Sequence, residues 1–371
     1  MDRRTFLKLA AAPLVAQARL RSHARSASFG EARQSAAGAT AAMTSERWRV
    51  FEITTRVQIL KPAGPTRVWL PMPLASAPYQ KTLGDTYQAP GGSVVIVEND
   101  DLDILIAEWS AGVEPALTVT SRVSTADRTA NLATPTVPPP LDGRVLDRFL
   151  RATRLIPTDG IVKTTAAQIT RGAGTDFERA RAIYDWIVDN TFRDPTTRGC
   201  GTGDIRFMLE SKNLSGKCAD LNALFVGLAR ASGIPARDVW GIRVAKSQND
   251  LRSLGLSSDN ATRAQHCRAE VYLTGYGWVP VDPADVRKVA LEEPPGHLPI
   301  DDEKVRTARA RLFGSWEMNW MAFNYAHDVL LPRSKRGTLG FFMYPQAETA
   351  NGRLDSLDPD NFKYEITARE V

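Results

Sequence analysis

The first part of the chain alternates hydrophobic and polar residues in short runs that proline and glycine separate. The run from Arg49 to Leu60 is rich in β-branched residues. Similar runs follow at 66–70, 93–97, 102–109 and 116–123. A repeat of two residues with frequent turns is typical of a sandwich of antiparallel strands. The pattern therefore predicts an N-terminal β-sandwich domain over residues 47–133.

The hydrophobic repeat changes after residues 134–140, where consecutive prolines predict a stiff linker. Thr175 and Glu178 have the spacing of a capping box and precede an apolar stripe with helical period. A second helix is predicted from Ala219 to Ser232. Strand patterns follow at 238–244, 266–273 and 276–281. Residues 141–371 are therefore expected to form an α+β domain with a C-terminal extension.

The first 18 residues have the features of an export signal. Arg3 and Arg4 form a twin-arginine pair, a short apolar run follows, and Ala16-Gln17-Ala18 offers a cleavage site. That run is too short for a permanent membrane span. Residues 19–46 lack an apolar period and are predicted to be a disordered tether. We expect a mature protein without a membrane span, in the periplasm or outside the cell.

The net charge of +5 is concentrated at the N-terminus. Residues 1–46 contribute seven basic and three acidic side chains, whereas residues 47–371 contain 40 basic and 39 acidic ones. The nearly neutral mature chain leaves no basic face for contacts to phosphates, so nucleic-acid binding is not expected.

Candidate chemistry begins at Cys218, which directly precedes the second predicted helix. A helix N-terminus carries unpaired amides and partial positive charge, and both favour a thiolate over a thiol. The same amides can donate to an oxyanion, and Gly216 permits close approach of a substrate backbone. Cys218 is therefore the candidate nucleophile, and a buried structural cysteine is the alternative.

His266 opens a predicted strand, and Asp282 directly follows the next one. Strand alternation places His266 on the polar face and Cys267 on the apolar face, away from the chemistry. A two-residue loop between the strands would turn Asp282 to the wrong face, whereas a three-residue loop, 274–276, pairs Leu273 with Gly277. Asp282 then lies opposite Arg268 and diagonal to His266, although Arg268 is able to capture it as an ion pair. We predict the three-residue loop.

Several other side chains are weaker candidates. Asn213 and Trp278 are candidates for the oxyanion site or the substrate groove, as are Gly216 and Arg268. Cys200 and Cys267 are either a disulfide or two separate buried thiols. The three cysteines and His266 have poor spacing for a metal site, so no metal is expected. The aromatic run 316–325 and His327 are interpreted as structural.

These motifs together resemble the transglutaminase-like superfamily of papain-like cysteine enzymes. The resemblance rests on Gly216-Lys217-Cys218-Ala219-Asp220, on residues 228–237, on His266 and on residues 275–283, and it covers about residues 177–290. It implies a papain-like α+β domain with an antiparallel sheet, in which Cys218 is the nucleophile, His266 the base and Asp282 the orienting group. The family's eukaryotic cross-linking members use calcium, but no matching site is visible and no cofactor is expected.

The expected function is an exported cysteine enzyme that cleaves an amide of a peptide, protein or cell-wall substrate through a Cys218 thioester. Water is the default acceptor at its high concentration, so hydrolysis by an amidase or protease is favoured over transfer to an amine. The alternative is an inactive module of the same fold that binds peptides or assists envelope assembly. An intact Cys, His and Asp set argues for the enzyme, because a binding cleft needs no activated thiol.

Overall fold

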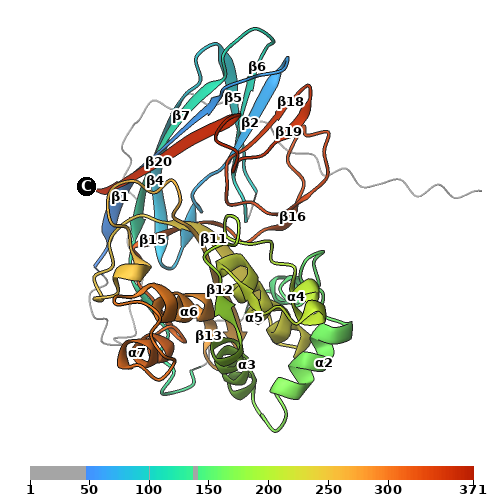
Figure 1. Cartoon of the computed structure of the whole chain (residues 1–371), viewed down its shortest axis with the longest axis vertical. Coiled ribbons are helices and arrows are strands. Elements are labelled where there is room, and N and C mark those ends of the chain that lie inside the picture. Colours follow the sequence, from blue (N-terminus) through green and yellow to red (C-terminus); the bar gives the residue numbers. More distant parts are fainter. Residues whose placement is uncertain (1–46, 100, 137–140) are drawn as a thin grey trace, which may run out of the picture. The chain divides into compact units, whose positions relative to one another are not determined.

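The computed structural model describes residues 47–99, 101–136 and 141–371. The predicted export signal and tether therefore lie outside the described residues, as do residues 137–140 of the predicted linker. Within 47–371, two five-stranded antiparallel sheets adjoin a four-stranded sheet that is flanked by helices (Figure 1). The fold is thus the expected α+β arrangement, with N-terminal antiparallel sheets followed by a core in which helices flank an antiparallel sheet.

The two five-stranded sheets form a sandwich. The first has the order β20-β1-β7-β4-β3, with strands Phe362–Glu370, Arg49–Ile59, Ala116–Thr125, Gln80–Gln88 and Ser76–Ala77. The second has the order β19-β18-β2-β6-β5, with strands Gly352–Leu354, Gln346–Thr349, Thr66–Pro71, Ile104–Trp109 and Gly92–Val97. Alternate residues of both sheets meet in one buried cluster that includes Val57, Leu105 and Phe362.

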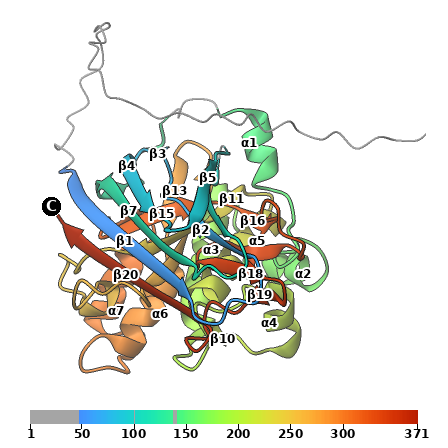
Figure 2. The same ribbon diagram turned by 90° about the horizontal axis from the view of Figure 1, so that it is seen from above.

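Strands from both ends of the chain build these sheets. β20 pairs with β1 over nine residues, from Phe51 opposite Glu370 to Ile59 opposite Phe362. The two long strands run side by side in Figure 2. β18 likewise pairs with β2. The C-terminal part of the chain, which the sequence assigned to the second domain, thus returns to the sandwich after the α+β core is complete.

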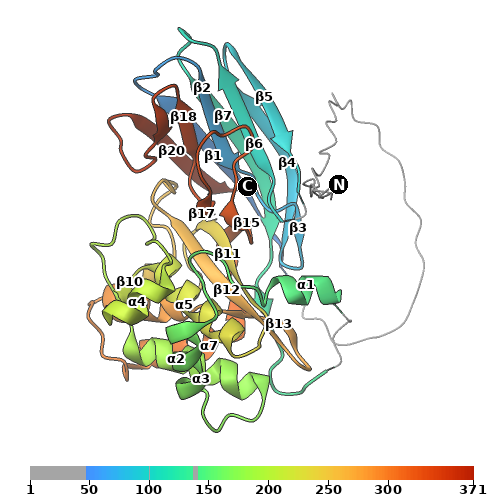
Figure 3. The same cartoon turned by 90° about the vertical axis from the view of Figure 1, so that its right-hand side faces the viewer.

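The core sheet has the antiparallel order β13-β12-β11-β15, with strands Gly277–Val281, Gln265–Leu273, Ala236–Arg243 and Trp320–Asn324. The longer helices around it are α2 (Gly160–Ile169), α3 (Asp176–Asn190), α5 (Cys218–Ala231), α6 (Pro283–Glu292) and α7 (Glu303–Arg311). Two short helices are α1 (Gly143–Arg148) and α4 (Ile205–Ser211). Figure 3 shows α1 on the opposite side of this sheet from α2, α3, α4 and α5.

Short elements complete the chain. They are β8 (Arg128–Thr129), β9 (Phe192–Arg193), β10 (Ser215–Gly216), the 3₁₀ turn Arg252–Leu254, β14 (Ser315–Trp316), β16 (His327–Val329) and β17 (Leu339–Phe341). β9 and β10 pair in parallel, which fixes the chain just before Cys218.

Two helices follow the sequence pattern closely. In α3 the Thr175 hydroxyl accepts from the Glu178 amide, the Glu178 carboxylate accepts from the Thr175 amide, and the predicted apolar stripe is buried. α5 ends before Gly233, which has a left-handed conformation with φ of 79°. α5 is buried all round rather than along one stripe, because it lies between the core sheet and helices α2, α3 and α6.

Among the described residues, no helix combines the length and apolar character that a bilayer crossing requires.

Because β20 belongs to the sandwich core, its buried residues should contribute to the free energy of unfolding. Phe362 is 1 % exposed in the sandwich core, whereas its neighbour Lys363 is exposed. Phe362→Ala should lower the free energy of unfolding by about 3–5 kcal/mol, since it removes a large buried ring. Lys363→Ala is the matched control and should change it by less than about 0.5 kcal/mol. Urea denaturation of both variants measures the difference, and equal values would contradict the role of β20 in the core.

Candidate active site

Cys218 is the first residue of α5, and a buried carboxylate fixes the backbone around it. The Asp220 side chain accepts from the amides of Thr202 and Gly203, both at 2.9 Å, and of Lys217 at 3.0 Å. A Cβ on Gly216 would lie 2.4 Å from the Asp220 carboxylate. Gly216 is therefore needed at this position to make room for the Asp220 side chain.

The hairpin of β12 and β13 brings His266 and Asp282 together. Leu273 pairs with Gly277 and Ala269 with Val281, which confirms the predicted three-residue loop and its register. His266 Nε2 lies 2.8 Å from Asp282 Oδ2, and both residues are buried. Since Nε2 contacts the carboxylate, Nδ1 is the ring nitrogen left for the hydrogen bond between His266 and the Cys218 sulfur.

Asp282 is held from several sides. It is the N-cap of α6, where its Oδ1 accepts from the Asp285 amide at 3.1 Å. The same oxygen accepts from Asn222 Nδ2 at 3.1 Å, and that amide group also donates to the Cys267 carbonyl at 2.9 Å. Asn222 lies one turn after Cys218 on α5, so this one helix positions both the thiol and the carboxylate.

A second carboxylate and two arginines surround this pair. Asp285 Oδ2 lies 3.4 Å from His266 Nε2, and Asp285 Oδ1 accepts from Arg243 Nη2 at 2.6 Å. Arg268 Nε lies 3.6 Å from Asp282 Oδ2, so the ion pair considered from the sequence is present without displacing His266. His266, Asp282 and Asp285 offer atoms within 4.8 Å of one another that a cation could use. The guanidinium groups already neutralise these two carboxylates, which disfavours a metal there.

These contacts shift the proton affinities of the site. Hydrogen bonds from Cys200 and Cys267, together with the neighbouring His266, hold the pKa of Cys218 well below its usual value although burial opposes this. Burial alone lowers the pKa of His266, but Asp285 and Asp282 outweigh it and raise that pKa to about 10. Both shifts favour a thiolate beside an imidazolium.

The three cysteines converge, although strand alternation predicted that Cys267 would point away from the chemistry. All three are free and buried. Cys267 lies in the apolar core as predicted, but its thiol also donates to Cys218, so it does not point away from the chemistry. Cys200 is on the loop after β9, which reaches the start of α5 through a hydrogen bond from the Ala219 amide to the Cys200 carbonyl at 2.9 Å.

Three of the weaker candidates from the sequence do not contact the Cys218 sulfur. Asn213 is exposed, and its side-chain oxygen accepts from the Ser215 amide and hydroxyl in a tight turn. Trp278 packs against Phe149 and Arg237. Arg268 is buried behind Asp282, where its guanidinium lies over the Trp320 ring. None of the three forms a substrate groove beside Cys218 in this structure.

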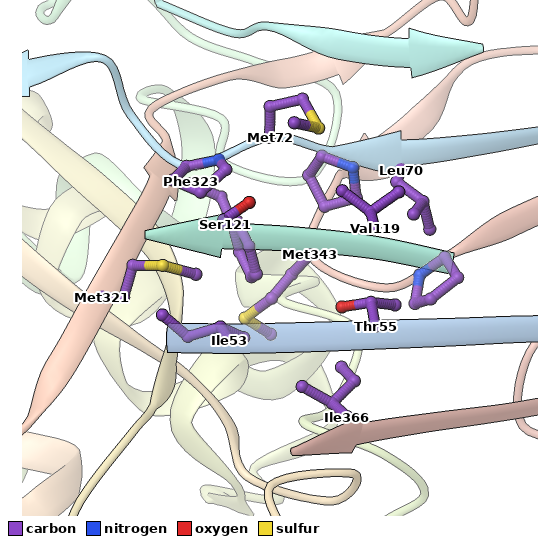
Figure 4. A pocket seen from close by; sticks show the side chains of 13 residues that line it. Ile53, Thr55, Leu70, Met72, Val119, Ser121, Met321, Phe323, Met343 and Ile366 are labelled. Atoms are coloured by element: carbon purple, nitrogen blue, oxygen red, sulfur yellow. The ribbon is translucent and has the colours of Figure 1, made fainter. Parts of the chain in front are cut away.

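The site is closed. Cys218 is 3 % exposed, and Tyr344, from the segment between β17 and β18, hydrogen-bonds Cys200. A separate apolar cavity lies between the sandwich and β15, lined by Met343, Met321, Phe323 and sandwich side chains rather than by residues of the candidate site (Figure 4). Its volume of about 30 Å³ is roughly that of one water molecule, too small for a substrate side chain.

The sequence analysis missed four residues of this site: Asn222, Arg243, Asp285 and Tyr344. Helical spacing offered a signal for Asn222, because residues four apart share a helix face and a buried amide on an apolar helix needs partners. Asp285 follows Asp282 by three residues in the first turn of α6, which is also a readable spacing. Arg243 and Tyr344 come from distant segments, and no local pattern marks them.

The chain is similar to several known proteins. The sequence profile of the transglutaminase-like superfamily matches residues 163–283, a range that contains Cys218, His266 and Asp282. An uncharacterized protein of Haemophilus influenzae is 34 % identical over 342 residues, which cover 87 % of this chain and 92 % of that protein. A candidate cysteine protease of Cytophaga hutchinsonii has 17 % identity and a TM-score of 0.49, over 87 % of this chain and 98 % of that one. The chain belongs to the transglutaminase-like superfamily.

The thiolate and imidazolium pair predicts an unusual pH dependence of alkylation. A free thiol reacts about tenfold more slowly for each pH unit below its pKa. Because the pKa of Cys218 is lowered, its reaction with iodoacetamide should stay nearly constant from about pH 7 to 9. Peptide-resolved mass spectrometry measures the rate at each cysteine.

Two controls accompany this measurement. Cys200 and Cys267 have raised pKa values and should remain slow in the same samples. His266→Asn removes the positive partner, so the Cys218 rate should then rise with pH as that of an ordinary thiol does. A tenfold rise per unit near pH 8 in the unmodified protein would contradict the ion pair.

Proposed function

We propose that this protein is a cysteine hydrolase that cleaves amide bonds of peptide-type substrates through a Cys218 thioester. The observation that carries the proposal is the buried contact of 2.8 Å between His266 and Asp282 beside a thiol whose pKa is strongly lowered. A carboxylate that orients an imidazole next to an activated thiol is the arrangement that acyl transfer needs.

The proposed reaction has two steps. The Cys218 thiolate attacks the amide carbonyl carbon, the oxyanion meets the N-terminus of α5, and the His266 imidazolium protonates the leaving amine. Water then attacks the thioester while His266 takes its proton, and Cys218 leaves as the thiolate. The Cys218 amide suits the oxyanion because it is the first of the helix, whereas the Ala219 amide is already donated to Cys200.

Substrate entry requires movement of the segments over the thiol, since Cys218 is almost fully buried. The choice between water and an amine as acceptor depends on which of them reaches the thioester once the site has opened. Water is present at far higher concentration, so hydrolysis is favoured over transamidation. We also propose that the protein is exported through a twin-arginine signal, a proposal that depends on residues 1–18 alone.

Replacing the nucleophile tests the function. Cys218→Ala should reduce amide cleavage by at least about 10⁴-fold, because no other group can form the thioester. The fold should persist, as checked by circular dichroism, since a small side chain replaces another at a helix start. The substrate is sought by trapping: purified protein is incubated with cell-envelope extract, and the covalent adduct on Cys218 is identified by mass spectrometry. Full activity of Cys218→Ala would refute the assignment.

The inactive-module alternative predicts a different set of results. Unmodified protein would show an ordinary thiol titration at Cys218, would form no adduct with the extract, and would cleave none of a panel of amides.

Replacing the orienting group tests the mechanism. Asp282→Asn keeps the size of the side chain and an oxygen for the α6 cap, but it removes the charge beside His266. Turnover should fall by roughly 10²–10⁴-fold, with a smaller change in KM. Steady-state kinetics on the substrate identified by trapping measures both constants. Unchanged turnover would indicate that Cys218 and His266 act as a pair without Asp282.

A further inference from the structure

The proposed mechanism uses one thiol, yet all three cysteines of the chain gather at the site. They come from the loop after β9, the start of α5 and strand β12. Cys200 is 6 % exposed, Cys218 3 % and Cys267 0 %. Structural packing alone does not require two further thiols to donate to the sulfur of the candidate nucleophile.

The backbone holds Cys200 close to Cys218. The Ala219 amide donates to the Cys200 carbonyl at 2.9 Å, and Cys200 Sγ lies 3.1 Å from the Gln265 carbonyl oxygen, a second acceptor for its single proton. The Cys200 carbonyl oxygen is two bonds from the Cys200 Cα, and the Ala219 nitrogen is two bonds from the Cys218 Cα. The two Cα atoms therefore lie within about 8 Å of each other. Disulfides need a separation of about 4.4–6.8 Å, so a small loop adjustment suffices.

Cys200 is also the thiol that can make such an adjustment. Gly199 and Gly201 flank it with φ of 58° and 96°, on a loop rather than in a sheet. Cys267 instead lies within β12, where it pairs with Trp240 of β11. A strand residue with no exposed surface has little freedom to approach another sulfur, whereas a glycine-flanked loop residue has more.

We propose that Cys218 and Cys200 form a peroxide-oxidised pair, with Cys218 as the attacking thiol and Cys200 as the resolving thiol. The Cys218 thiolate attacks a hydroperoxide such as hydrogen peroxide. A sulfur–oxygen bond forms, the O–O bond breaks, and the leaving hydroxide takes a proton from His266 to become water. The Cys200 sulfur then attacks the sulfenic acid, an S–S bond forms, and a second water leaves with the Cys200 proton.

This pair has a chemical consequence for the protein. An exposed sulfenic acid is oxidised further to irreversible products, whereas a neighbouring thiol converts it into a disulfide that reductants reverse. The disulfide would block Cys218 as a nucleophile until it is reduced. The proposal concerns thiol chemistry alone and holds whatever amide the protein cleaves.

The test treats the purified full chain with hydrogen peroxide and maps its disulfides by mass spectrometry without reduction. The free thiols should fall from three to one, with Cys200 linked to Cys218, and dithiothreitol should restore all three. Cys200→Ser should instead accumulate Cys218 sulfenic acid, which dimedone traps, and then the sulfinic acid. Cys267→Ser is the matched control and should still form the disulfide.

Two outcomes would overturn the proposal. One is a disulfide between any other pair of cysteines in the unmodified chain. The other is oxidation of Cys218 to the sulfinic acid at the same rate in the unmodified chain and in Cys200→Ser, with no disulfide. The mapping of the unmodified chain needs no variant and no amide substrate, so its result is independent of the hydrolase test.

Discussion

Charge neutrality inside the protein is the constraint on which the site depends. Arg243, Arg268, Asp282 and Asp285 are almost fully buried around His266, where an unpaired charge costs several kcal/mol. Two guanidinium and two carboxylate groups cancel, so a protonated His266 needs one more negative charge. The Cys218 thiolate supplies it. Hydrogen bonds from Cys200 and Cys267, with the contact to His266, lower the pKa of the thiol, whereas Asp285 and Asp282 raise the pKa of the imidazole. The two opposite charges then lie side by side and compensate each other.

Helix α5 connects the charged groups of the site to the rest of the fold. It is buried all round, so its position is set by the core sheet and by three helices at once. Its first residue is Cys218, Asp220 fixes the loop before it, and Asn222 reaches Asp282. A shift of the helix would disturb the nucleophile and the orienting carboxylate together. The sandwich lies beside the α+β core. The C-terminal segment that leads back to the sandwich carries Tyr344, which hydrogen-bonds the Cys200 thiol.

Local patterns in the sequence predicted the parts of the site that depend on period and turn length. Strand alternation and the three-residue loop placed Asp282 diagonal to His266, as the observed pairing of Leu273 with Gly277 confirms. They failed where distant segments meet. No local signal shows that β20 pairs with β1 or that the loop at Cys200 reaches α5. Alternation also assigned Cys267 to the apolar face correctly, but it could not show that the start of α5 lies against that face.

Burial and reactivity oppose each other at this site. Excluding water strengthens the contacts among Cys218, His266 and Asp282, because charges interact more strongly where water does not screen them. The same exclusion keeps a substrate out, since Cys218 is only 3 % exposed. A closed site of this kind holds the thiolate ready, through thiol donors rather than solvent, until the covering segments move. In the proposed hydrolase mechanism, the carbonyl carbon of the substrate must approach the Cys218 sulfur where the Cys200 thiol now lies, so the donor that stabilises the resting thiolate must move away.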